Sequence, residues 1–240
     1  MSHSEIKTMK RQPGEFRLPR IKTAADIEAL SHLSKEEKDL AMFNLNKEPP
    51  TDGWTMMIND PELQAFWSMM QSEFIALFDG DFIAIPFSFM NLTTLVTVKH
   101  TNSNWHYGFL TAWTGKQIGA HKLPEISYAK LAQLDYPDAD VWTDEERLII
   151  KFAVALLEHS MSDELFDQAR AAFGDKKVLR GIAWVGYVKM WAMLVDALDL
   201  KYLATMDLPA MPPEIVETLT SSFQNIRPEM KSLWMNMKAS

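Results

Sequence analysis

Signals that start helices recur along this chain, and apolar residues follow each of them at helical spacing. The segments 34–37 (Ser-Lys-Glu-Glu) and 143–146 (Thr-Asp-Glu-Glu) are capping boxes, in which a hydroxyl and a carboxylate bind backbone N–H groups of the first turn. Asp60 before Pro61 is another start, because aspartate caps well and proline fits the first helical position. The pattern favours a helical fold.

The spacing of apolar residues between these signals sets the expected elements. We expect helices over 24–33, 34–45, 61–78, 102–117, 128–134, 143–157, 162–174 and 175–198. Asn102 or Ser103 would cap the fourth of these, and Gly174 would end the seventh. Propensity leaves the stretch 82–101 undecided, because it is rich in strand-favouring Ile, Thr and Val yet long and free of turn signals.

A length of 240 residues is enough for one large domain. Pro13 and Pro19 punctuate an extended N-terminal arm over 1–22. The predicted domain covers 23–205, and a helical extension follows over 206–240.

Charge and composition exclude several classes of protein. The net charge of -8 argues against binding to nucleic acid, and the apolar runs are too short to cross a membrane. The basic start has no apolar signal region after it, so we expect a cytoplasmic protein. The 9 dispersed glycines form no phosphate loop or dinucleotide motif, so we expect no cofactor.

The chain contains no cysteine, which excludes disulfides, thiolate metal sites and thiol nucleophiles. His100, His106, His121 and His159 are scattered without the spacing of metal ligands, so no metal site is predicted.

Two segments resemble one known family. In the first, Trp142 to Asp175 contains a Glu-Arg helix start and a Ser-Asp-Glu-Leu-Phe helix that ends in Phe-Gly-Asp, and a Val-Gly-Tyr helix follows over 185–198. The second runs from Asn91 to Tyr107. Together they resemble carboxymuconolactone decarboxylase-like and alkylhydroperoxidase D-like proteins, over roughly residues 15–200.

This resemblance implies an all-α fold, an alkylhydroperoxidase D-like orthogonal helix bundle, and therefore helix for the stretch 82–101. It also implies a homo-oligomer, a trimer or a multiple of it. The apolar helix near the C-terminus is the expected contact, through Trp184, Tyr187, Met190, Trp191, Met193 and Leu194.

The chain departs from the family at the reactive residues. A glutamate, two cysteines and a histidine serve the peroxidase branch, and by position they fall on Asn91, Ser103, His106 and Leu110. None is retained. A serine hydroxyl cannot cycle through sulfenic acid, so thiol peroxidase activity is excluded.

Three residues are the candidates for catalysis. His106 suits general acid/base work, because the ordinary histidine pKa lies near neutrality. Ser103 lies on the same helix face and Asn91 stands at the acidic position of the family, so both are candidates to bond a substrate oxygen. The alternatives are a structural histidine, a helix cap, and a surface or cap asparagine.

A set of aromatic and Met residues is the candidate lining of a pocket: Trp67, Met70, Met90, Trp105 and Tyr107. Such a pocket would favour a flat, apolar, carbonyl-bearing ligand. The alternative is that these side chains fill the core.

Two functions follow. The first is a cofactor-independent enzyme, a lyase, isomerase or cyclase of secondary metabolism, acting on a small cyclic or polyketide-like carbonyl compound by acid/base catalysis and pocket preorganisation. The second is a non-catalytic oligomeric binding or scaffold protein in which the family's active site has decayed.

Overall fold

The computed structural model describes residues 17–47, 52–78, 81–200, 211–216, 228–229, 231–233 and 235, and within these residues it contains helices and no strand. The helices are α1 (Ala24–Glu28), α2 (Lys35–Lys47), α3 (Asp52–Met57), α4 (Pro61–Leu77), α5 (Phe89–His100), α6 (Asn104–Ala120), α7 (Ile126–Ala132), α8 (Asp144–Leu157) and α9 (Asp163–Ala197). The all-α prediction is confirmed for this part of the chain.

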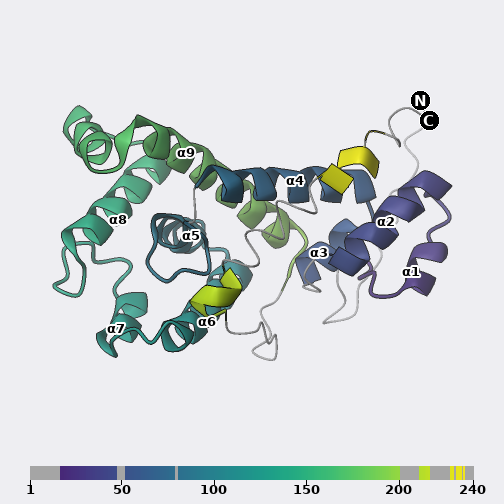
Figure 1. Cartoon of the computed structure of the whole chain (residues 1–240), viewed down its shortest axis with the longest axis horizontal. Helices are drawn as coiled ribbons and strands as arrows, with labels where there is room; N and C mark the ends of the chain where they lie inside the picture. Colours follow the sequence, from purple (N-terminus) through teal and green to yellow (C-terminus); the bar gives the residue numbers. More distant parts are fainter. Residues whose placement is uncertain are drawn as a thin grey trace, which may run out of the picture.

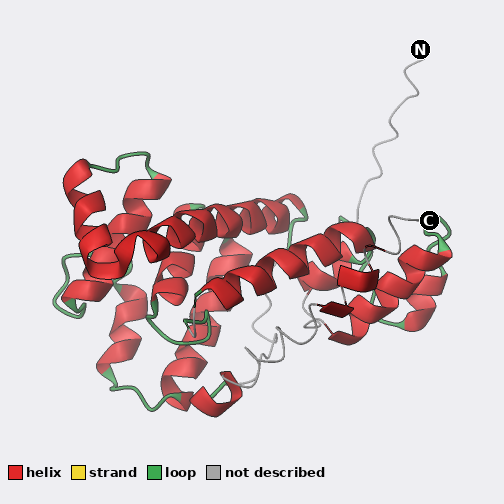
Figure 2. Cartoon of the chain, turned by 45° about the horizontal axis from the view of Figure 1, so that its top comes forward, coloured by secondary structure: helices red, strands yellow, loops and turns green. Residues whose placement is uncertain are grey.

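Helix α5 lies at the centre of one end of the molecule, with α6, α8 and α9 around it (Figure 1). Helices α1, α2 and α3 gather at the other end. The long helices α4 and α9 connect the two ends and lie next to each other in both views (Figure 1 and Figure 2). Ring contacts join them, with Trp67 5.3 Å from Trp191 and Phe74 5.4 Å from Trp184.

Side-chain caps begin most helices where the sequence predicts them. Thr23 and Thr143 each form a complete capping box, and Asp60 accepts a hydrogen bond from the N–H of Leu63. The hydroxyl of Ser34 accepts from the N–H of Glu37, whose carboxylate accepts from the N–H of Ser34. The helix expected over 24–33 ends early, at Glu28.

The undecided stretch 82–101 is a loop over 81–88 followed by α5. Residues 89–98 of α5 are all buried. The β-branched residues Thr93, Thr94 and Thr97 are compatible with this helix, because each hydroxyl donates to the carbonyl four residues earlier, at 2.6–2.7 Å. Polar side chains in a buried helix are satisfied in this way, and the helix implied by the resemblance is confirmed over 89–100.

Helix α9 contains a sharp break at Gly174. Gly174 has φ 76° and ψ 158°, a backbone conformation that a side chain would disfavour, so the segment is two helices joined at this residue. Within the described residues, α9 is also the one helix whose length and composition would suffice to cross a membrane. Half of its apolar window is buried within the chain, as in a core helix of a globular protein, so this indication is weak.

Parts of the predicted arm and extension contact the domain. The N–H of Ile21 donates to the carbonyl of Thr55 at 3.0 Å, and the Ile21 side chain is buried. Residues 1–16 of the arm lie outside the described residues, as do most of 206–240. In the extension, the N–H of Met211 donates to Gln117 Oε1 of α6 at 2.7 Å.

Candidate functional site

Four helices bring aromatic rings together around Trp191. We call this the Trp191 cluster: Trp54 of α3, Trp67 of α4, Trp105 and His106 of α6, and Tyr187 and Trp191 of α9. The rings of Trp54 and Trp67 each lie 5.3 Å from that of Trp191, and the His106 ring lies 6.2 Å from it. The Trp105 ring is 5.7 Å from that of His106. Three of the predicted site residues, Trp67, Trp105 and His106, therefore belong to one cluster.

The polar atoms of these three residues are buried without a hydrogen-bond partner among the described residues. They are Nε1 of Trp67, Nε1 of Trp105 and Nδ1 of His106. Buried polar groups are almost always paired, because an unpaired one costs about 1–3 kcal/mol. An indole N–H can only donate, so the two tryptophans call for an acceptor such as a carbonyl oxygen.

His106 differs electrostatically from the predicted acid/base residue. Its side chain is 6% exposed, and burial lowers its pKa to about 3, because the charged imidazolium loses its hydration there. The imidazole is therefore neutral near pH 7. A neutral imidazole can donate or accept a hydrogen bond but is a poor source of protons.

This burial predicts a pH dependence of stability. Below about pH 6.5 the unfolded chain binds a proton at His106 that the folded chain does not, since the folded pKa is about 3. The free energy of unfolding should therefore fall as pH decreases from about 6.5 toward 3, by up to ~1.4 kcal/mol per pH unit, with no contribution at higher pH. We expect His106→Gln to lose this part of the slope in urea titrations between pH 7 and 4. Equal slopes for the wild type and His106→Gln would mean that the His106 ring remains hydrated in the folded chain.

Asn91 is fully engaged within the fold. Its Oδ1 accepts from the N–H of Phe87 at 3.0 Å, and its Nδ2 donates to Ile83 O at 2.8 Å and to Thr114 Oγ1 at 3.1 Å. The residue is 1% exposed. It thus fixes the 81–88 loop, including Phe87 at φ 61°, against α5 and α6. Both amide hydrogens are used, so bonding a substrate through them would require a native bond to break.

Ser103 occupies the N-cap position of α6 but makes no capping bond with its side chain. Its hydroxyl donates to Asp196 Oδ1 of α9 at 2.9 Å, and the residue is completely buried. Asn102 precedes it with φ 54°. Ser103 therefore joins α6 to α9, a contact that the sequence alone does not indicate.

The other predicted lining residues contact different surroundings. Met90 is completely buried in α5, and Met70 packs against the main core while remaining partly exposed. The Tyr107 ring is half-buried, with Lys99 Nζ 5.6 Å from its centroid. Leu110, at the family's histidine position, is buried in the core. The geometry of these four residues fits packing.

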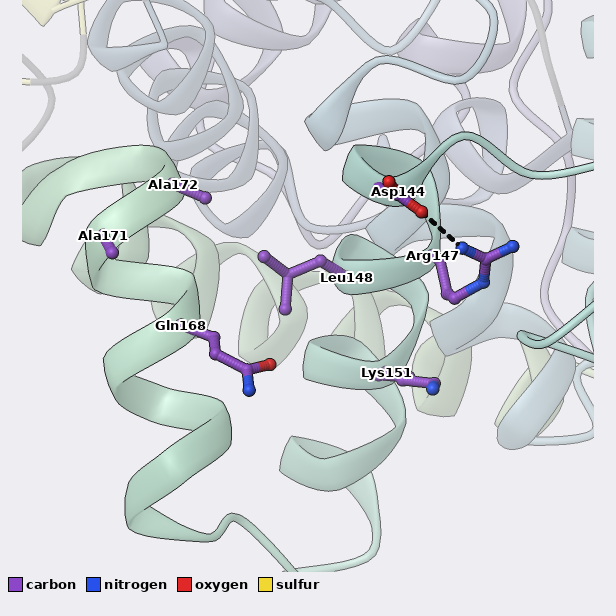
Figure 3. A pocket seen from close by; sticks show the side chains of 7 residues that line it. All are labelled: Asp144, Arg147, Leu148, Lys151, Gln168, Ala171 and Ala172. Atoms are coloured by element: carbon purple, nitrogen blue, oxygen red, sulfur yellow. Dashed lines mark hydrogen bonds and ion pairs between the residues drawn. The ribbon is translucent and has the colours of Figure 1, made fainter.

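A groove of about 530 Å³ lies between α8 and α9, away from the predicted residues (Figure 3). Its lining is Asp144, Arg147, Leu148, Lys151, Gln168, Ala171 and Ala172. Both cations form ion pairs: Arg147 Nη1 lies 2.6 Å from Asp144 Oδ1, and Lys151 Nζ lies 2.6 Å from Asp138 Oδ1. With its cations paired, the groove is a weaker candidate than the Trp191 cluster.

The sequence does not single out three rings of the cluster as site residues: Trp54, Tyr187 and Trp191. Trp54 is noticeable only as one of many aromatics, and the sequence predicts Tyr187 and Trp191 to lie at an oligomer contact. The structure buries Trp184, Tyr187 and Trp191 within the chain, at 2%, 7% and 9% exposure, which corrects that expectation for these three residues. Helical periodicity marks an apolar face but not its partner.

Among the described residues, no group of three or more His, Cys, Asp or Glu side chains is placed to hold a metal ion.

Comparison of the chain with family models, with curated proteins and with solved structures gives no match.

Proposed function

We propose that this chain is a cofactor-independent enzyme that acts on a small cyclic or polyketide-like carbonyl compound bound at the Trp191 cluster. The observation that carries the proposal is the set of three unpaired buried polar atoms, on Trp67, Trp105 and His106. Flat apolar rings that carry a few polar groups suit an apolar ligand with a carbonyl oxygen. We also propose the alkylhydroperoxidase D-like fold, which the sequence resemblance and the all-helical architecture support.

The chemistry best suited to this environment stabilises charge on the substrate oxygen. When a β-keto acid loses CO₂, the C–C bond to the carboxylate breaks and its electron pair passes to the carbonyl oxygen as an enolate. Preorganised N–H donors stabilise such an oxyanion in a dry site, and a neutral imidazole is a competent donor. In this proposal His106 donates a hydrogen bond, and solvent supplies the proton that later reaches carbon. Isomerisation or cyclisation through an enolate would use the same donors.

A second candidate is the non-catalytic binding or scaffold protein. Asn91 and Ser103, at two positions where the family carries reactive groups, are tied into intramolecular hydrogen bonds here. Side chains committed to the fold are consistent with a site that has become structural. The two candidates differ in whether the Trp191 cluster admits a ligand.

The test is binding and turnover with cyclic 1,3-diketones, β-keto acids, lactones and phenols. A ligand that binds the folded chain should raise its melting temperature. Trp105→Phe and Trp67→Phe keep an aromatic ring but remove the N–H, and each should weaken binding about tenfold, the effect of one neutral hydrogen bond. His106→Phe should act in the same direction and reduce turnover further.

Trp142→Phe is the matched control, because the Trp142 N–H already donates to the carbonyl of Tyr136 at 3.1 Å, outside the cluster. It should leave ligand affinity unchanged. Binding without turnover favours the binding protein. If no compound binds, and Trp105→Phe stabilises the chain by removing an unpaired N–H, the cluster is a filled core and the enzyme proposal fails.

A further inference from the structure

The outer face of α9 carries a continuous apolar stripe. Leu179 is 64% exposed, Ile182 37%, Met190 38% and Met193 65%. These positions recur at helical spacing and therefore share one face of the helix. That face is opposite the one through which Trp184 and Val188 pack into the core.

Helix α4 extends this surface. Its exposed residues Leu63, Phe66 and Leu77 lie on one face, at 39%, 43% and 42% exposure. Since α4 and α9 are antiparallel neighbours joined at Trp67–Trp191 and Phe74–Trp184, helical geometry places both exposed faces on the side of the pair away from α5.

The combined area is large for a monomer surface. With about 200 Å² for each fully exposed large side chain, the seven residues offer on the order of 600 Å². A stable dimer buries roughly 800 Å² on each partner, so this apolar surface would form most of one interface.

The order of residues along the stripe indicates the occupant. Gly186 lies at its middle, and the residues on either side match in an antiparallel arrangement: Leu179 would meet Met193 of a second copy, and Ile182 would meet Met190. The stripe is thus complementary to itself, which a two-fold contact between identical chains requires. We propose that two copies of this chain associate through the outer face of α9, antiparallel about a two-fold axis at Gly186.

Gly186 allows the helices to approach closely. A Cβ built on Gly186 would meet no atom within 4 Å, and the neighbouring Ala183 is small and exposed. Small residues at a helix crossing reduce the distance between the two backbones. The midpoint of the stripe is therefore the position where two α9 helices fit most tightly.

The first test is mass in solution. Light scattering at micromolar concentration should give twice the 27.5 kDa chain mass, or an even multiple of it. Met193→Glu should raise the dimer Kd at least roughly 100-fold, because it places two carboxylates in an apolar contact. The control Ile126→Glu, at an equally exposed apolar residue of α7 (55%), should leave the mass unchanged.

The second test uses the absence of cysteine from the chain. Gly186→Cys should form a disulfide-linked dimer under mild oxidation, because a residue on the two-fold axis meets its own counterpart. Ile126→Cys should not. A monomer mass for the wild type, or equal cross-linking of the two variants, would overturn the proposal. So would a monomer that binds phosphatidylcholine vesicles through Met193, since the face would then be a membrane contact.

Discussion

Replacing Asn91 with aspartate should destabilise the chain by about 3–5 kcal/mol near pH 7, the cost of an uncompensated buried charge. The carboxylate could still accept from the N–H of Phe87. It could not donate to Ile83 O. In place of the amide nitrogen that now donates to this carbonyl at 2.8 Å, a negatively charged oxygen would face it. The Thr114 hydroxyl could turn to donate, and this would offset only part of the loss.

The penalty should depend on pH in a defined direction. Burial raises the pKa of the new carboxyl above its unfolded value of about 3.9, so the penalty is full above the folded pKa and shrinks as pH falls toward 4. Urea unfolding at pH 7 and pH 5 measures this. Asn104→Asp is the control: it makes the same chemical change at an exposed position in the first turn of α6, where a negative charge is tolerated.

A second variant, Asn91→Ala, separates the two roles considered for this residue. If Asn91 only fixes the loop, the total activity of Asn91→Ala should follow the fraction folded, and the activity per folded molecule should be unchanged. If Asn91→Asp keeps wild-type stability at pH 7, the amide does not hold the loop as the structure indicates, and its predicted role in orienting substrate regains weight.

The sequence predicted local features of the fold well. Thr23, Thr143, Asp60 and Gly174 act through backbone groups within a few residues of themselves, so their effect can be read from neighbouring positions. The stretch 82–101 was undecidable from propensity because the hydroxyl bonds that suit its threonines to a helix form only once the helix exists.

The candidate site was predictable only in part. The sequence indicates His106, Trp105 and Trp67, but the contact of His106 and Trp67 with Trp191 links α4, α6 and α9 across long separations in sequence. Asn91 and Ser103 are candidates only through the resemblance to a family, and their partners Thr114 and Asp196 are set by packing. The pKa of His106 depends on burial, which residue type does not reveal.

A largely buried ion pair joins α7 to α8, and removal of one partner of such a pair lowers the stability of a protein strongly. Lys130 Nζ lies 2.6 Å from Glu146 Oε1 and 2.7 Å from Oε2, and the two side chains are only 11% and 13% exposed. The ammonium also lies 4.9 Å from the ring centroid of Phe87 and 5.8 Å from that of Trp142. It therefore connects the loop that Asn91 fixes with the start of α8.

Lys130→Met should destabilise the chain by about 3 kcal/mol, the lower end of the cost of breaking a buried ion pair. The lower end applies because the Glu146 carboxylate would still accept a hydrogen bond from the N–H of Thr143, at 2.9 Å. Adding Glu146→Gln should recover much of the loss, since glutamine removes the unpaired charge and can still serve in a capping box. Lys151→Met is the matched control, because it breaks a 2.6 Å pair with Asp138 whose side chains are 42% and 79% exposed, and it should be close to neutral. Guanidinium unfolding of the four proteins gives the comparison. If Lys130→Met and Lys151→Met lower the free energy of unfolding equally, the Lys130–Glu146 pair is hydrated. If the double variant is no more stable than Lys130→Met, the loss comes from packing of the lysine stem on Phe87 and Trp142.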